Sequence, residues 1–185
     1  ILTQVGADSF MIDRVGLVRS EDELERTRNN PRISLDDAQA VRRFAPSVSA
    51  VMAESRRNGT IGYREHILER VRIQGVTSEF IRFPTFDAER GRLMTPSEVD
   101  RKRNVAVLGW DAAERLFGEA DPLDENIRIE GVHFRVIGVS QKKGAVFGQS
   151  QDEYAVVPLG AFQRLFGSRT QLGLRVQPAD PDNMI

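Results

Sequence analysis

Hydrophobic and polar residues alternate along several stretches of the chain, which predicts strands that bury one face. The first pair is a strand over residues 48–57 and a return strand over residues 65–74, joined by a turn at Asn58-Gly59. Asn-Gly is a strong hairpin signal because both residues tolerate the left-handed backbone conformation of tight turns. The side chains expected to face the core on the return strand are Ile67, Val71 and Ile73.

The stretch 91–139 predicts a strand and a short helix in its middle part. Residues 104–109 form an apolar run that ends in glycine, as a buried strand often does. Asp111 and Glu114 have the spacing of a helix start with a capping acid. Gly118 lies where glycine commonly ends a helix. Two further strands, 127–130 and 133–137, alternate apolar and polar residues and predict a hairpin.

The same reasoning predicts the remaining elements. In chain order they are a strand over 8–13, a helix that Ser34 caps and Pro46 ends, a short helix or turn over 78–83, a strand over 154–157, a helix over 159–166 and a strand over 170–177. The alternation of strands and helices favours an α/β or α+β fold with mixed sheets.

Residues 140–151 interrupt this pattern with a polar segment that contains two glycines. We expect a long hairpin or a projecting loop here. It does not match the Gly-Lys-Ser/Thr signature of a phosphate-binding loop, because its two lysines precede the glycine. An apolar pair framed by polar residues is a common design of contact surfaces. The candidate partner-binding residues are Lys142, Lys143, Val146 and Phe147.

Composition narrows the function classes. The 185 residues carry 26 basic and 27 acidic side chains, a balance that gives no support to nucleic-acid binding. The absence of cysteine excludes disulfides, thiol catalysis and zinc–thiolate sites. No run of about 20 apolar residues predicts a membrane span. Residues 1–10 lack the basic start and apolar core of a signal peptide.

The sequence offers no pattern typical of catalysis. The two histidines, His66 and His133, fall in separate predicted strands without a nucleophile motif. The basic run 101–103 is interpreted as a solvated loop rather than a phosphate site. We therefore predict no catalytic, cofactor-binding or metal-binding residues and no cofactor.

The order of several short motifs resembles a known family. These motifs are Leu35–Ala38, Ala45–Val48, Ile73–Val76, Gly91-Arg92, Asn104–Gly109, Leu116–Gly118, Asp121–Leu123, Ile127–Gly131, Phe134–Val139, Asp152–Tyr154 and Val157–Leu159. Together they are similar to the periplasmic core domain of MacB-like ABC transporter permeases, a group that includes FtsX-like and lipoprotein-releasing permeases. The resemblance covers roughly residues 6 to 180. One departure is Asp124, where the family usually has glycine.

The resemblance implies two subdomains. A mixed-sheet, porter-like subdomain would comprise residues 1–92 and 168–185, and a small α/β subdomain would be inserted over residues 93–167. In the family the porter-like unit continues into another helix and strand after its last strand here. We therefore expect this unit to be incomplete at its C-terminal end.

The resemblance also implies a function. The domain would be the extracytoplasmic part of an ABC transporter permease in the cell membrane, on the periplasmic or extracellular side. It would couple cytoplasmic ATP hydrolysis to export, to substrate or lipoprotein handling, or to mechanotransmission, and would not be an enzyme itself. Its partners would be its own transmembrane helices, an ATP-binding subunit or domain, a permease dimer partner, and an adaptor or substrate protein. Two alternatives remain open: a small soluble hydrolase or ligand-binding domain, and a stand-alone protein-binding adaptor.

Overall fold

The computed structural model describes residues 2–4, 9–14, 30–146 and 149–179, with only the backbone described at 2–4, 145, 146 and 149. The chain forms two compact units. Unit 1 comprises Ile1–Ser55 with Arg169–Ile185, and unit 2 comprises Arg56–Ser168. The sequence placed the first subdomain boundary at residue 92, so the porter-like and inserted subdomains stay a prediction.

Unit 1 is built on an antiparallel sheet. Its strands are β1 (Leu2–Gln4), β2 (Phe10–Ile12), β12 (Gly173–Pro178) and the first part of β3 (Val48–Tyr63), in the order β1-β2-β12-β3. Alternation on β2 buries Met11, while Phe10 and Ile12 are only partly buried. Leu174 and Val176 on β12 are buried beside the apolar residues 50–53 of β3, with which they pair.

Helix α2 (Leu35–Phe44) also belongs to unit 1, and its start confirms the predicted cap. Ser34 accepts a hydrogen bond from the Asp37 backbone N–H, and the Asp37 carboxylate accepts one from the backbone N–H of Ser34. This capping box satisfies amides that have no partner inside the helix. The helix has no buried residue, and Phe44 at its end is 74% exposed.

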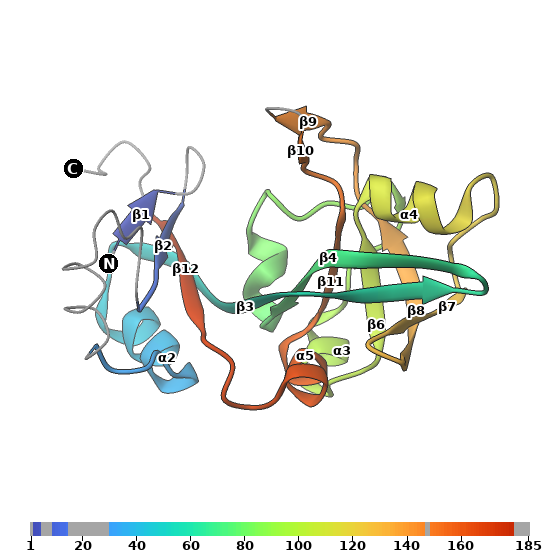
Figure 1. Cartoon of the computed structure of the whole chain (residues 1–185). Coiled ribbons are helices and arrows are strands. Elements are labelled where there is room, and N and C mark those ends of the chain that lie inside the picture. The colour runs from blue at the N-terminus through green and yellow to red at the C-terminus, as the bar shows by residue number, and fades with distance from the viewer. Residues whose placement is uncertain (1, 5–8, 15–29, 147–148, 180–185) are drawn as a thin grey trace. The chain divides into compact units, whose positions relative to one another are not determined.

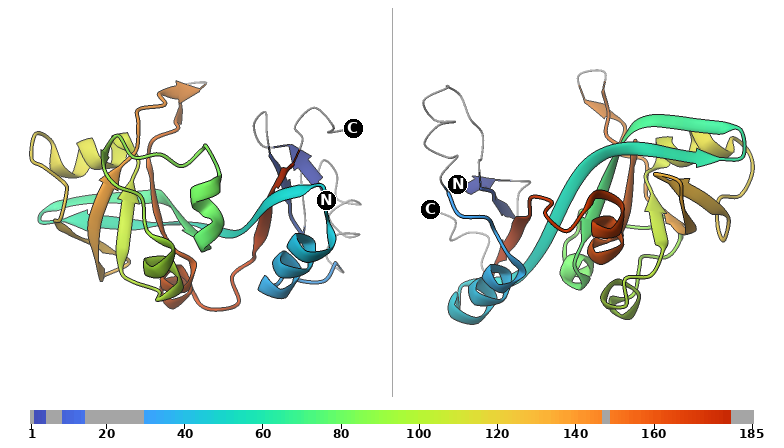
Figure 2. Two further views of the ribbon diagram at one scale, coloured as in Figure 1. Left: turned by 180° about the vertical axis from the view of Figure 1, so that it is seen from behind. Right: turned by 60° about the horizontal axis from the view of Figure 1, so that its bottom comes forward.

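Unit 2 contains the rest of the described elements. In chain order they are the end of β3, β4 (His66–Val76), η1 (Ser78–Arg82), β5 (Arg90–Gly91), α3 (Pro96–Asp100), β6 (Val105–Leu108), α4 (Trp110–Phe117), β7 (Asn126–Ile129), β8 (Val132–Val139), β9 (Ala145–Val146), β10 (Gln149–Ser150), β11 (Tyr154–Pro158) and α5 (Leu159–Phe166). Figure 2 shows β3 and β4 as one long ribbon, with α4 over its turn end. The mixed α/β class predicted from sequence is confirmed.

The strands of unit 2 close into a ring. Neighbouring strands pair in the order β3-β4-β11-β6-β8, and β7 pairs with both β8 and β3. The β4–β11 and β6–β8 pairs are parallel, whereas β11–β6, β7–β8 and β3–β7 are antiparallel. Each strand of the ring therefore has a neighbour on both sides over part of its length, which reduces the edge that is available to a foreign strand.

The ring and two helices share one apolar core. Ile61, Ile73, Ile127 and Phe134 contribute from the strands, and all are at most 1% exposed. In the view of Figure 1, α4 lies above the β3–β4 ribbon and α5 lies below it. Leu116 of α4 and Phe162 of α5 belong to the same cluster.

The predicted turn at Asn58-Gly59 is wrong. β3 continues through both residues to Tyr63, and the chain turns at Arg64, where φ is 50°. A side chain at Gly59 would lie 2.9 Å from Glu130 Oε1 and 3.1 Å from Phe166 Cζ. The glycine at this position therefore allows close packing against these side chains, and it does not form a turn.

The burial pattern on β4 also differs from the prediction. Val71 and Ile73 are fully buried as expected, but Ile67 is 61% exposed and Leu68 is buried instead. Arg70 adopts a φ of 59°, which breaks the alternation between Leu68 and Val71. The apolar face therefore shifts by one residue at this point.

Two helices of unit 2, α4 and α3, differ from what the sequence predicted. α4 ends at Gly118 as predicted, but it begins after Gly109 without a side-chain cap, so Asp111 is not the capping residue. Helix α3, whose capping box of Thr95 and Glu98 is complete, was not predicted from the sequence. Asp124 takes a φ of 64°, a conformation that glycine adopts at little cost, which accounts for the glycine that the family usually has at this position.

The contact between β4 and α5 generates a test. A Cβ atom at Gly75 would lie 2.5 Å from Phe162 Cβ, close to the helix backbone. We expect Gly75→Ala to lower the free energy of unfolding by about 1–3 kcal/mol in urea titrations, because the packed core cannot absorb the methyl group. Gly62→Ala is the control, since its nearest neighbour would be 3.6 Å away. It should change stability by at most about 1 kcal/mol, and equal losses in the two variants would contradict the packing argument.

Candidate functional site

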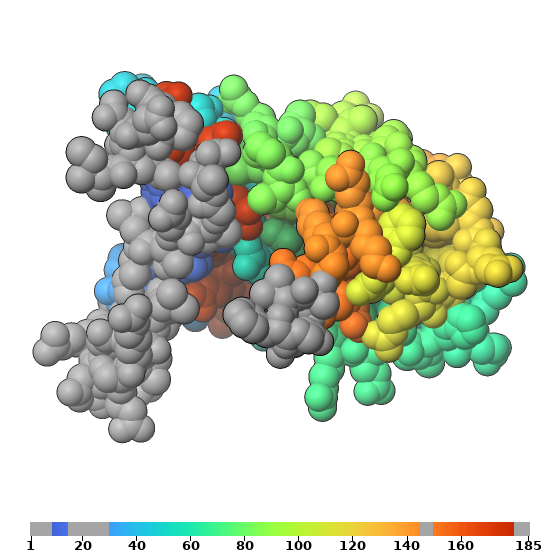
Figure 3. All heavy atoms as spheres, turned by 90° about the horizontal axis from the view of Figure 1, so that it is seen from above, coloured from blue at the N-terminus to red at the C-terminus, as the bar shows by residue number. Residues whose placement is uncertain are grey.

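β9 and β10 form a hairpin within residues 140–151, where the sequence predicted a long hairpin or a projecting loop. β9 and β10 pair antiparallel, with Ala145 opposite Ser150 and Val146 opposite Gln149. Figure 3 shows this orange segment at the surface, between the green segment that follows β4 and the yellow α4. The hairpin is a separate small sheet and does not extend the ring.

A buried carboxylate holds the base of this hairpin. Asp152 is fully buried, and its Oδ2 accepts hydrogen bonds from the backbone N–H groups of Lys143 and Gly144 at 2.8 and 2.7 Å. The backbone N–H of Gln151 donates to Gly144 O at 2.9 Å. These bonds join the two ends of the segment, so the hairpin starts from a fixed base.

The base is also packed against the ring. A side chain at Gly109 would lie 2.1 Å from the carbonyl oxygen of Asp152, so only glycine allows this approach. The N–H of Gly109 donates to Tyr154 O at 2.8 Å. The Tyr154 hydroxyl donates to Ser140 Oγ at 2.8 Å, and both residues are buried. The start of α4 therefore positions both ends of the segment.

The four candidate partner-binding residues occupy different environments. Lys142 is exposed, with its Nζ 5.9 Å from the centre of the Trp110 ring. Lys143 is tied to the base, because its Nζ donates to Thr85 O at 2.8 Å and lies 3.4 Å from Asp87 Oδ2. Only the backbone of Val146 is described, and Phe147 lies outside the described residues.

Sequence reasoning missed the residues that anchor the hairpin. Asp87 accepts a hydrogen bond from the Gln141 N–H at 2.7 Å, in addition to its contact with Lys143. Asp152 carried no distinct signal, because it stands next to Glu153 and the two read as a pair of solvated acids before β11. Asp87 carried none, because its partners arrive from a distant part of the chain.

The two histidines lie on different strands. His66 and His133 are both exposed, on β4 and β8 respectively. The Nδ1 of His66 lies 2.7 Å from Leu116 O, so this nitrogen donates to a backbone carbonyl. This geometry assigns His66 a structural bond to α4 and does not favour the hydrolase alternative. No cluster of potential metal ligands occurs among the residues the structure describes.

The role of Asp152 can be tested by hydrogen exchange. Asp152→Ala should speed the exchange of the Lys143 and Gly144 amides and cost about 1–3 kcal/mol of stability, since buried donors lose their acceptor. Asp152→Asn keeps an oxygen and should preserve most of the protection. The neighbouring Glu153→Ala, which removes only a surface pair with Arg115, should leave both amides protected. Unchanged exchange in Asp152→Ala would refute the anchoring role.

The chain resembles proteins of one family along almost its whole length. Residues 2–185 match the MacB-like periplasmic core domain. A macrolide export ATP-binding/permease protein MacB from Bdellovibrio bacteriovorus is 34% identical over 167 residues, which cover 90% of this chain and 25% of that protein. A pyoverdine export ATP-binding/permease protein PvdT from Pseudomonas aeruginosa is 31% identical and covers 82% of this chain and 24% of that protein. The chain thus spans about a quarter of the length of these relatives.

Solved structures share the fold. The periplasmic region of MacB from Actinobacillus actinomycetemcomitans superposes with a TM-score of 0.74 at 18% identity, over 94% of this chain and 75% of that one. The extracellular domain of the transporter YknZ from Gram-positive bacteria gives 0.72 at 23% identity, over 93% and 83%. No helix among the described residues is long and apolar enough to cross a membrane. The family match and the relatives above 30% identity agree, and this chain belongs to the MacB-like periplasmic core domain family.

Proposed function

We propose that this chain is the extracytoplasmic domain of an ABC transporter permease that lies in the cell membrane. Transmembrane helices and an ATP-binding domain or subunit would belong to the same transporter, which would act as a permease dimer. The domain itself would carry out no reaction and would respond to ATP hydrolysis in the cytoplasm. Export, substrate or lipoprotein handling, and mechanotransmission are the activities such a domain would serve.

The match of residues 2–185 to a periplasmic core domain is the observation that supports this proposal most strongly. Relatives whose names include export and ATP-binding/permease cover most of the chain. The architecture is also suited to a mechanical role. A closed ring of strands with one apolar core resists local opening, so unit 2 can move as a body.

The β9–β10 hairpin is our proposed contact surface for an adaptor or substrate protein. Its base is fixed by Asp152, while Lys142 is exposed beside the ring of Trp110. A preorganised base lowers the entropy that a partner must remove on binding. In this proposal Lys143 holds the hairpin through Thr85 and Asp87, and Lys142, Val146 and Phe147 meet the partner.

Reporter fusions test the location. The parent protein, truncated after Ile185, is fused either to alkaline phosphatase, which is active only outside the cytoplasm, or to a fluorescent protein that matures only inside it. We expect active phosphatase and no fluorescence, and the opposite for fusions to the ATP-binding domain. Fluorescence from the Ile185 fusion would refute the extracytoplasmic placement.

A second experiment tests the hairpin. A photo-cross-linking residue at position 147 of the parent protein should capture a second extracytoplasmic protein, and Phe147→Asp should abolish co-purification of that protein without unfolding the domain. Ile67, which is 61% exposed on β4, provides the matched control for both changes. Ile67→Asp should leave capture intact. Full capture by the Phe147→Asp variant would show that the hairpin is not the contact surface.

A further inference from the structure

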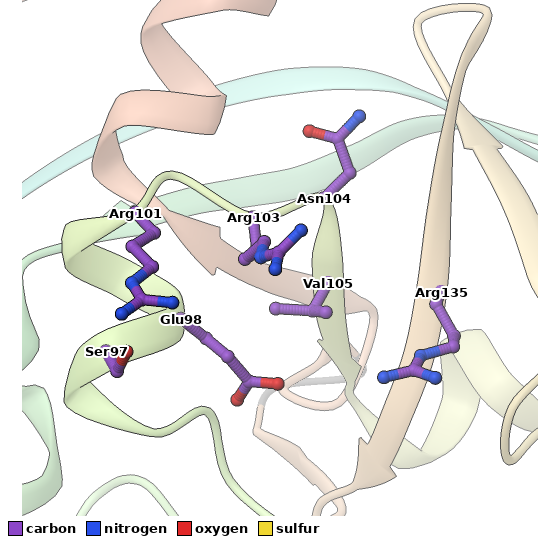
Figure 4. Close-up of a pocket in the computed structure, with 7 residues that line it drawn as sticks. All are labelled: Ser97, Glu98, Arg101, Arg103, Asn104, Val105 and Arg135. Carbon is purple, nitrogen blue, oxygen red and sulfur yellow. The ribbon is translucent and has the colours of Figure 1, made fainter.

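Unit 2 has a second feature, a basic pocket between α3 and β8. Its volume is about 570 Å³. The residues that line it are Ser97, Glu98, Arg101, Arg103, Asn104, Val105 and Arg135. They come from α3, from the turn between α3 and β6, and from β8, which pairs with β6 at Val105 and Arg135. Figure 4 shows Arg103 and Arg135 reaching toward the space beside Val105, with Arg101 at the end of α3.

The pocket carries an excess of positive charge. Arg101 and Arg103 have no ion-pair partner among the described residues, and Arg135 lies 3.9 Å from Asp124, an exposed carboxylate. Glu98 is the only acid among the residues that line the pocket, and its carboxylate is already paired with Arg92. Arg92 donates to both of its oxygens, at 2.7 and 2.8 Å, and this pairing lowers the pKa of Glu98 to about 2. Three guanidinium groups therefore face a space without a free anion.

The arginines are held in place by the backbone. The N–H groups of Lys102 and Arg103 donate to Val99 O and Glu98 O, each at 2.9 Å, so the turn continues the bonding of α3. The N–H of Arg135 donates to Asn104 O at 3.0 Å, which fixes β8 to the same turn. The three arginines thus start from main-chain positions that are fixed relative to one another.

Arg164 on α5 also holds the turn between α3 and β6 in place. Arg164 Nη2 donates to Lys102 O and to Asn104 Oδ1, both at 2.6 Å. Lys102 has a φ of 55°, and its aliphatic stem lies against Gly160, where a Cβ would approach within 2.4 Å. Lys102 is not among the residues that line the pocket, so packing separates it from its two basic neighbours.

From this geometry we infer that the pocket binds a phosphate group. Guanidinium forks match the oxygens of phosphate, and several arginines from different elements suit an ion with more than one negative charge. Ser97 adds a hydroxyl to the lining, whereas Val105 is its only apolar residue, which disfavours an apolar ligand. A free phosphate compound and a phospholipid headgroup share this chemistry. The inference does not depend on the hairpin or on transport.

The test uses the 185-residue chain and inorganic pyrophosphate as the probe. Calorimetric titration should show saturable binding that weakens as salt is added. Arg103→Gln/Arg135→Gln should reduce the affinity at least about tenfold, because two charge-assisted contacts are lost. Arg101→Gln alone should reduce it less. Arg70→Gln/Arg82→Gln is the control, since it makes the same change in net charge at exposed residues outside the pocket.

A second arm identifies the source of the phosphate. Sedimentation with phosphatidylcholine vesicles that contain phosphatidic acid should be sensitive to the pocket variant if a lipid headgroup is the ligand. Vesicle binding that is absent or insensitive to the pocket variant, combined with pyrophosphate binding that is sensitive to it, assigns a soluble phosphate compound. Circular dichroism checks that each variant is folded.

Three outcomes would overturn the inference. They are no saturable pyrophosphate binding, equal losses in the pocket and control variants, and binding of an acidic peptide but not of pyrophosphate. Each of them leaves the reporter-fusion result unaffected, so failure here is distinguishable from failure of the proposed transport role.

Discussion

The double pairing of β7 is the constraint on which the structure of unit 2 depends. Ile129 on β7 lies opposite Ile61 on β3, and the other side of the same strand pairs with β8. Without β7, the sheet would end in two open edges and its core would be exposed between them. With it, β8 is held between β6 and β7, which fixes Arg135 beside the turn that carries Arg101 and Arg103.

Local signals in the sequence identified most of the helices and strands. They did not predict that the strands of unit 2 close into a ring. The apolar run of β6 and the glycine after α4 act within a few residues, and both were predicted correctly. Gly59 was misinterpreted because its function depends on Glu130 and Phe166, which are distant in sequence. The same holds for β4, where the conformation of Arg70 moved burial from Ile67 to Leu68. Only α3 was missed despite a clear local signal in Thr95 and Glu98.

The β9–β10 hairpin and the basic pocket also depend on contacts between residues that are distant in sequence. Composition was enough to predict a long hairpin or a projecting loop over residues 140–151, but not that Asp152 anchors it from within the core. The basic run 101–103 was interpreted as a solvated loop, and its side chains are indeed exposed. What the sequence could not reveal is that parallel pairing of β6 and β8 adds Arg135 to them. Without this long-range contact the same residues would be only a charged run, and with it they line a pocket.

The place of β11 in the ring has a consequence for folding during synthesis. β11 is the last strand of unit 2 in the sequence, yet it lies between β4 and β6, parallel to one and antiparallel to the other. Until residues 154–158 have left the ribosome, β4 and β6 each keep an unpaired edge. Pairing between such distant segments is slow, because the intervening loop must be closed first. From the synthesis of β6 until that of β11, the nascent chain therefore exposes two unpaired strand edges, and insertion of one short strand removes both at once.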